Sequence, residues 1–175
     1  SYAEMGWQHG KLASEVCGDV VPMYFNDIIA SLVGHTYPAV AGIANWLLKW
    51  VFYTLNKKRI GRPVMDQVEG MTEAFGVPVS MGAKGLLVPD IVHFLIGKTF
   101  PGYLPAAPSC SGFMARETAT EDGKLIVGRN FDFFGQGIWD ENNALIFLEP
   151  EEGQKFCWIG ALGVPVSGQG MNESG

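Results

Sequence analysis

The first half of the chain places apolar residues at the spacing of helices. From residue 2 to about residue 31 apolar side chains recur at helical intervals, with a kink or break expected at Pro22. A further helix is predicted to begin at Pro63, a favoured first-turn residue, and to end at the Gly-Val-Pro of residues 76–78. Another is predicted from about residue 84 to residue 97. Helices therefore dominate this part of the chain.

The longest apolar run, residues 37–55, has three possible interpretations. Its 19 residues approach the length that crosses a bilayer, but Asn45 and Lys49 interrupt it and basic residues 57–59 follow at once. An amphipathic helix that lies on a core or at a membrane interface fits this pattern better than a membrane span. The pattern favours the buried or partly buried helix, and contact with a membrane surface remains an alternative.

A proline-rich segment, residues 98–109, separates this helical pattern from a different one. Three prolines and a glycine in twelve residues exclude regular structure and mark a linker. We expect a helical segment over residues 1–109, with the linker at its end, and a β-rich part over residues 110–175. The chain is therefore predicted to be an α+β protein.

Strand patterns begin directly after the linker. A strand over residues 111–117 and a return strand over residues 124–132 flank an Asp122-Gly123 hairpin signal. A second antiparallel pair is predicted over residues 144–148 and 155–159, joined by a polar turn.

Composition narrows the function classes. Twelve Lys and Arg against 18 Asp and Glu give a net charge of −6, so we expect no nucleic-acid partner. A hydrophobic content of 47% with only 17% charged residues is typical of a folded chain. The 175 residues suffice for one domain or two small ones.

No signal-peptide pattern opens the sequence, and both ends look cut, so we expect a fragment of a longer protein.

Three cysteines, Cys17, Cys110 and Cys157, are too few and too scattered for a disulfide framework. Cys110 lies where the linker meets the first strand, a useful position for a nucleophile. The alternative is an ordinary cysteine that begins a strand, because free cysteines are commonly buried and inert. The three histidines, His9, His35 and His93, lie far apart with no ligand spacing, so no metal is expected. The glycines form no nucleotide-binding motif, so no cofactor is expected.

Cleavage of the bond between Ser109 and Cys110 would give the thiol its own base. The new α-amino group, with an ordinary pKa of about 7.7–8.0, would be partly neutral at pH 7. The thiol could make this cut itself by attacking the Ser109 carbonyl, which forms a thioester that water hydrolyses. A single residue would then supply both nucleophile and base.

Several motifs, taken together and in this order, resemble the N-terminal nucleophile (Ntn) hydrolases that act on linear amide C–N bonds. This group includes the choloylglycine hydrolases, penicillin V acylase, acid ceramidase, N-acylethanolamine acid amidase and the acyl-CoA:6-aminopenicillanate acyltransferase (C45) family. Residues 4–12 resemble the helical pro-segment of the C45-like members. The other matching motifs are Cys110-Ser111-Gly112, Asp122-Gly123-Lys124, the Gly-Arg-Asn-Phe-Asp-Phe of residues 128–133, and the Gly-Met-Asn-Glu-Ser-Gly of residues 170–175.

The resemblance implies a role for each matching residue. Cys110 matches the nucleophile freed by autocatalytic cleavage after Ser109, and Arg129 matches the arginine beside it. Asp132 matches the carboxylate that orients the free amine, while Asn130 and Asn172 match site-supporting positions. Since Arg129 and Asp132 are three apart on a strand, a bulge or turn at residues 130–131 is expected to bring both to Cys110.

The resemblance also implies a fold and an activity. The fold would be the start of an αββα antiparallel sandwich, incomplete in this chain, with the oxyanion-hole residue beyond Gly175. The substrate would be a linear N-acyl amide, lipid-like if the aromatic residues of the helical segment form a groove for an acyl chain. The helical segment and the remainder of the β-rich part are expected to stay partners after cleavage. Members of the group often work outside the cytoplasm or in acidic compartments, which gives a weak preference for such a location.

Three alternatives remain open from the sequence. A competing amine could accept the acyl group from the thioester, which would make the protein an acyltransferase. The chain could instead be a non-catalytic protein whose helices bind a partner or a membrane surface. A papain-like enzyme, with Cys110 paired to a distant histidine, lacks its local signature here.

Overall fold

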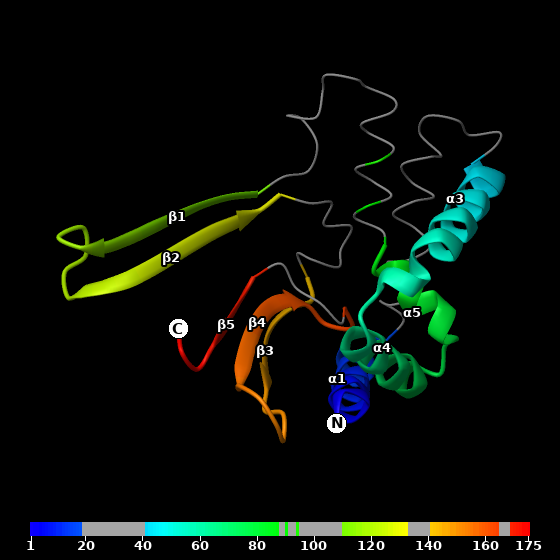
Figure 1. The fold of residues 1–175 in the computed structure, drawn as a ribbon, viewed down its shortest axis with the longest axis horizontal. Coiled ribbons are helices and arrows are strands. Elements are labelled where there is room, and N and C mark those ends of the chain that lie inside the picture. The colour runs from blue at the N-terminus through cyan, green and yellow to red at the C-terminus, as the bar shows by residue number, and fades with distance from the viewer. Residues whose placement is uncertain (19–40, 88–89, 91–93, 95–109, 133–140, 165–168) are drawn as a thin grey trace. The chain divides into compact units, whose positions relative to one another are not determined.

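The computed structural model of the chain describes residues 1–18, 41–87, 90, 94, 110–132, 141–164 and 169–175. Its contacts divide the chain into two units, which we describe separately (Figure 1). The first unit comprises residues 1–92 and 135–175, and the second comprises residues 93–134. The predicted linker, residues 98–109, and the predicted break at Pro22 lie outside the described residues. The predicted boundary between residues 109 and 110 stays a prediction.

Two helices form the centre of the first unit. Helix α1 spans Tyr2–Cys17 and begins at Ser1, whose side-chain oxygen accepts the Glu4 N–H at 3.2 Å. Helix α4 spans Arg62–Phe75, with a proline in its first turn and Gly76 as its C-cap. Gly76 has a φ of 67°, a left-handed conformation that glycine adopts without strain. The helix predicted from Pro63 to Gly76 is confirmed.

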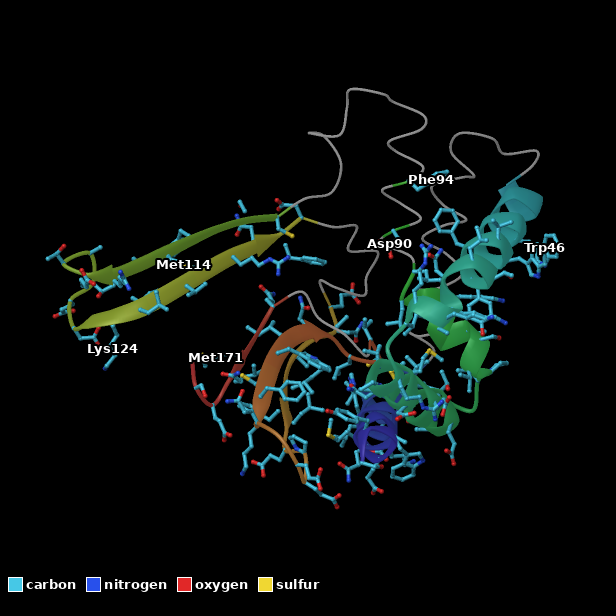
Figure 2. All side chains as sticks on the ribbon, in the orientation of Figure 1. Trp46, Asp90, Phe94, Met114, Lys124 and Met171 are labelled. Atoms are coloured by element: carbon cyan, nitrogen blue, oxygen red, sulfur yellow. The ribbon has the colours of Figure 1, made fainter. Side chains whose placement is uncertain are left out.

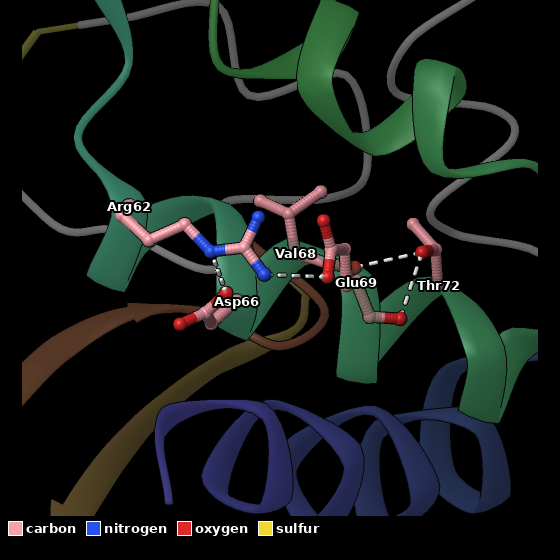
Figure 3. A network of polar contacts seen from close by, with 5 residues as sticks. All are labelled: Arg62, Asp66, Val68, Glu69 and Thr72. Atoms are coloured by element: carbon pink, nitrogen blue, oxygen red, sulfur yellow. Dashed lines mark hydrogen bonds and ion pairs between the residues drawn. The ribbon is translucent and has the colours of Figure 1, made fainter.

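Helices α1 and α4 pack closely because small residues line their contact. A side chain at Gly70 would overlap the Ala3 carbonyl oxygen, and one at Gly6 would overlap the Gln67 carbonyl oxygen. The fully buried Thr72 hydroxyl of α4 donates to the Val68 carbonyl at 2.7 Å, so no polar group is left unsatisfied there (Figure 3). On the exposed side Arg62 pairs with Asp66 at 2.7 Å and with Glu69 at 3.6 Å (Figure 3).

The remaining helices of this unit differ in how well the sequence predicted them. Helix α3 spans Ala41–Asn56 and continues into the 3₁₀ helix η2, Lys57–Arg59, in agreement with the predicted amphipathic helix. Helix α5 spans Val79–Gly85 and was not predicted, since it overlaps the helix expected over residues 84–97 only at residues 84 and 85. The sequence pattern indicates Pro78 only as part of a helix stop, whereas Pro78 also supplies the extended N-cap residue from which α5 begins.

Residues 90 and 94 are helical, and the rest of the predicted helix beyond residue 87 lies outside the described residues. Within the described parts of the chain, no helix is long and apolar enough to cross a membrane.

The first unit also contains a three-stranded antiparallel sheet in the order β3-β4-β5. Strand β3 spans Asn143–Leu148, β4 spans Phe156–Ala161 and β5 spans Gly170–Asn172. The predicted pairing of the first two strands is confirmed, with Leu148 opposite Phe156. Met5 of α1, Leu148 and Trp158 form a buried cluster between helix and sheet, so the N-terminal helix and the C-terminal strands share one core.

His9 of α1 contributes to the same contact. Its Nε2 atom accepts the Gly163 N–H at 3.2 Å, and its ring lies 6.4 Å from the Trp158 ring, centroid to centroid. The side chain is therefore a structural acceptor in its neutral form, as expected of a histidine that packs against strands. Burial lowers the pKa of His9 from 6.5 to about 4.

We predict that His9 makes the first unit sensitive to acid. Below pH 6.5 the unfolded chain protonates this histidine, whereas the folded chain does so only near pH 4. The free energy of unfolding is therefore expected to fall by about 3 kcal/mol in total as the pH falls from 6.5 to 4, because the folded state keeps His9 neutral over this range. Urea unfolding of wild type and His9→Gln at pH 7 and pH 4.5 measures this, since glutamine keeps an acceptor but does not titrate. Equal losses in both proteins would contradict the prediction.

The described part of the second unit is a long hairpin, with strands β1, Cys110–Glu117, and β2, Gly123–Phe131 (Figure 1). The Asp122-Gly123 prediction is confirmed: the Lys124 N–H donates to Asp122 Oδ1 at 3.1 Å, and Gly123 has a φ of 73°. The side chain and the N–H of Lys124 together lower the pKa of the exposed Asp122. Apolar side chains such as Met114, labelled in Figure 2, are exposed on this hairpin. The protein is thus α+β, with helices and two antiparallel sheets.

Candidate functional site

The hairpin places Cys110 and Arg129 on one face. Cys110 is the first residue of β1 and is exposed. It pairs with Phe131, and Gly112 pairs with Arg129. Because side chains alternate along strands, these four positions share a face, and Arg129 is the diagonal neighbour of Cys110.

The Arg129 guanidinium contacts the Cys110 thiol directly. Its Nη2 atom donates to Cys110 Sγ at 2.9 Å, and its Cζ atom lies 5.8 Å from the centre of the Phe131 ring. Gly112, which pairs with Arg129, has no side chain to come between the guanidinium and the sulfur. A cation at this distance attracts negative charge on the sulfur more than it attracts a neutral thiol. The arrangement can therefore support thiolate chemistry.

The bulge predicted at residues 130–131 is absent, and that prediction was wrong. Pairing is regular from Cys110–Phe131 through Gly112–Arg129, and the irregularity in this ladder lies further along, between Ala115 and Glu117. Arg129 needs no bulge, because its long side chain reaches the diagonal position on a regular ladder, whereas no hydrogen bond or ion pair brings Asp132 to Cys110 within the described residues.

The remaining predicted residues of this motif are placed differently. Asp132 directly follows β2 and is exposed, and within the described residues no hydrogen bond or ion pair joins it to Cys110. Asn130 pairs with Ser111, so it lies on the opposite face of the hairpin from Arg129. Ser109, the other side of the predicted cleavage point, lies outside the described residues. The roles of these three residues stay predictions.

Asn172 belongs to the first unit, where it supports an exposed turn. Its Oδ1 atom accepts the Ser174 N–H at 3.0 Å, and its Nδ2 atom donates to Gln154 Oε1 at 2.7 Å. Asn172 lines an open pocket of about 350 Å³ along β4 and β5, together with Gln154 and Cys157. Asn172 therefore stabilises this turn, while its role in supporting the site stays a prediction.

The three thiols differ in their surroundings. Cys110 is exposed, whereas Cys17 and Cys157 are partly buried, and burial raises the pKa of Cys17. Across the described ranges, no cluster of three or more His, Cys, Asp or Glu side chains could hold a metal ion.

Sequence reasoning gave no role to two contributors to this site, Phe131 and Gly112, although both stand in the matching motifs. Both are ordinary residues in a strand pattern, and their roles depend on which residues pair across the hairpin. The pairing register of the two strands is the signal that could have identified them. This register can be derived by counting residues outward from the Asp122-Gly123 turn, but only if the irregularity near Glu117 is known.

We predict that Arg129→Ala slows the reaction of Cys110 with iodoacetamide at pH 7 by roughly tenfold, the lower end of what a hydrogen bond to a charged group is worth at an exposed site. Alkylation is followed at each cysteine by peptide mass mapping. Arg129→Lys should fall between the two, because it keeps the charge but loses the planar donor group.

The matched control is Arg116→Ala in the same hairpin, since Arg116 pairs only with its neighbour Glu117 among the ion pairs of the described chain. This variant should react like wild type, and Cys17 should react at its own rate in all variants. Equal rates at Cys110 with and without Arg129 would show that the guanidinium does not assist the thiol.

Comparisons with known proteins give one similarity. An uncharacterized protein of Archaeoglobus fulgidus is 33% identical to this chain over 67 residues, which are 38% of this chain. The matched part spans about a tenth of that relative, 11% of its length. No family model matches the chain, and no solved structure matches it significantly.

Proposed function

We propose that this chain is a self-processing cysteine amidohydrolase of the Ntn type, which cleaves itself between Ser109 and Cys110 and then hydrolyses linear N-acyl amides. The observation that carries the proposal is the Arg129 Nη2 to Cys110 Sγ hydrogen bond of 2.9 Å, at the first residue of an exposed strand. A structural cysteine would need no guanidinium, whereas a nucleophilic one benefits from it. The motif resemblance supplies the reaction class.

Self-cleavage would proceed in two steps. The Cys110 sulfur attacks the Ser109 carbonyl carbon, the C–N bond breaks, and the former amide nitrogen takes up protons to become the free α-amino group. Water then attacks the resulting thioester, which leaves a carboxylate on Ser109 and returns the thiol to Cys110. The bonds and protons of these two steps balance without an oxidant, a metal or a cofactor.

Amide hydrolysis would repeat the same chemistry on a substrate. The freed α-amine of Cys110 acts as the base for its own thiol, and Asp132 accepts a hydrogen bond from this amine and orients it. The thiolate, favoured by Arg129, attacks the substrate carbonyl; the amine product leaves and water releases the acid. In this proposal the two antiparallel sheets belong to the beginning of an αββα sandwich.

The helical segment would remain bound after cleavage. Met5 precedes the proposed cleavage point, while Leu148 and Trp158 follow it, and the three share one buried cluster. Separation of the pieces would expose that cluster and the neutral His9 to water, which is unfavourable.

Mass spectrometry of the purified full-length protein tests the proposal. After incubation at mildly acidic pH, intact mass under denaturing conditions should give two pieces, one ending at Ser109 and one beginning at Cys110, while size exclusion without denaturant should keep them together. A substrate series of N-acyl amides then tests hydrolysis. A single mass after prolonged incubation, together with no amide hydrolysis, would overturn the proposal in favour of a non-catalytic protein.

A further inference from the structure

Helix α3 carries an aromatic pair that the rest of the described chain does not cover. Trp46 and Trp50 lie one turn apart with their rings parallel, 6.2 Å between centroids and 10° between planes. Trp46 is 64% exposed and Trp50 is 51% exposed. Figure 2 shows the Trp46 ring projecting outward from α3. Two stacked indoles in water are an unusual arrangement, because each could bury a large apolar surface elsewhere.

The stretch of sequence that contains this pair carries charges of one sign only. Between Asp27 and Asp66 the sequence has five lysines and arginines and no acidic residue, although the whole chain carries −6. Lys57 and Lys58 of η2 are exposed and follow α3 directly. At helical spacing Trp46, Trp50, Tyr53 and Lys57 fall on one side, and Lys57 Nζ lies 5.7 Å from the centre of the Tyr53 ring. A basic group thus adjoins the exposed aromatic stripe.

We propose that α3 and η2 form a docking surface for an anionic lipid bilayer. Indole rings favour the boundary between headgroups and acyl chains, and lysines beside them attract anionic headgroups. Helix α3 has 16 residues and is about 24 Å long at 1.5 Å per residue, shorter than the roughly 30 Å of a hydrocarbon core. The helix therefore lies along the bilayer surface.

The C-terminal end of α3 is held by the protein. Helix α3 contacts α5, and Lys84 Nζ of α5 lies 5.6 Å from the centre of the Tyr53 ring. This contact fixes the rotation of α3 near its C-terminal end, so the position of the tryptophan pair is set by the fold.

Charge complementarity selects the bilayer over a second copy of the chain. A symmetric dimer through α3 would bring the same basic segment of each copy together, which like charges oppose. An anionic bilayer instead complements both the tryptophans and the lysines. The proposal is independent of the thiol chemistry, since it involves no residue of the hairpin.

Cosedimentation with vesicles tests the proposal on the whole chain. We expect binding to vesicles of phosphatidylcholine and phosphatidylglycerol in equal amounts, weaker binding at high salt, and little binding to pure phosphatidylcholine. Replacing Trp46 and Trp50 together by serine should reduce the partition coefficient at least roughly tenfold. Lys57→Gln with Lys58→Gln should reduce it roughly twenty-five-fold, at about fivefold for each basic residue.

Two matched double variants control for the general loss of exposed apolar side chains and of positive charge. Leu12→Ser with Val16→Ser removes two exposed apolar side chains from α1, and Lys11→Gln with Lys124→Gln changes the net charge equally. Both pairs should bind vesicles like wild type, as should Cys110→Ala, so a failure of the proposed enzyme activity would leave this result untouched. Circular dichroism confirms that each variant is folded.

Two outcomes would overturn the proposal. One is an absence of binding to the anionic vesicles, or binding that the tryptophan and lysine variants leave unchanged. The other is self-association that depends on Trp46 and Trp50, measured by sedimentation equilibrium without lipid, which would assign the surface to a second copy of the chain.

Discussion

The Cys110→Ala variant is expected to remain a single chain under conditions in which the wild type separates into two pieces. The proposed cut needs a nucleophile next to the Ser109 carbonyl, and alanine has none. The expected effect is complete loss of cleavage, read as one intact mass. Cys110→Ser should cleave far more slowly, because a hydroxyl is a weaker nucleophile than a thiol whose negative charge a guanidinium stabilises.

The other two thiols serve as matched controls. Cys17→Ala and Cys157→Ala remove cysteines that lie partly buried in the first unit, and they should leave cleavage between residues 109 and 110 unchanged. N-terminal sequencing of the second piece should begin at cysteine. Cleavage of Cys110→Ala at the same bond would mean that an external protease makes the cut.

Trp158→Ala is expected to lower the free energy of unfolding of the first unit by about 3–5 kcal/mol, the usual cost of removing a buried tryptophan. Trp158 is only 9% exposed and contacts both the apolar cluster with Met5 and the ring of Phe156, at 5.8 Å between centroids. Within the described residues its buried Nε1 atom has no hydrogen-bond partner, so the loss is one of packing. Chemical denaturation measures the effect.

This measurement is best made in the Cys110→Ala background, where the chain cannot separate. In a cleaved wild-type background the same substitution should let the two pieces dissociate on size exclusion. Trp46→Ala is the matched control, because its side chain is 64% exposed and its removal should change stability by less than about 0.5 kcal/mol. Equal unfolding curves for Trp158→Ala and Trp46→Ala would mean that the helix-to-sheet cluster contributes little.

The sequence predicted those elements whose signals are local. Asp122-Gly123 specified the hairpin, and Pro63 with Gly76 specified the ends of α4, because each of these residues acts through its own backbone conformation. Helix α5 was missed because Pro78 both ends one element and begins the next. In each of these cases the ends of the element depend on a few neighbouring residues.

The candidate site was predicted only in part, because its geometry depends on pairing across strands. The motif resemblance named Cys110 and Arg129, but the expected bulge was wrong, since a diagonal contact on a regular ladder brings them together. The contact of His9 with Gly163 joins residues 154 positions apart, and no local signal in the sequence indicates this partner. Alternation along a strand does not indicate which distant helix will cover it.

The shared core of α1 and the sheet has a consequence for the order of folding. Arg129 and Cys110 are 19 positions apart, whereas His9 and Gly163 are 154 apart, so the second contact closes a loop about eight times longer. The longer closure costs about 2 kcal/mol more in chain entropy. The hairpin can therefore form early from local contacts. Helices α1 and α4 can also pair before the sheet packs against them. During synthesis, the face of α1 that carries Met5 and His9 therefore stays exposed to water until β4 has left the ribosome.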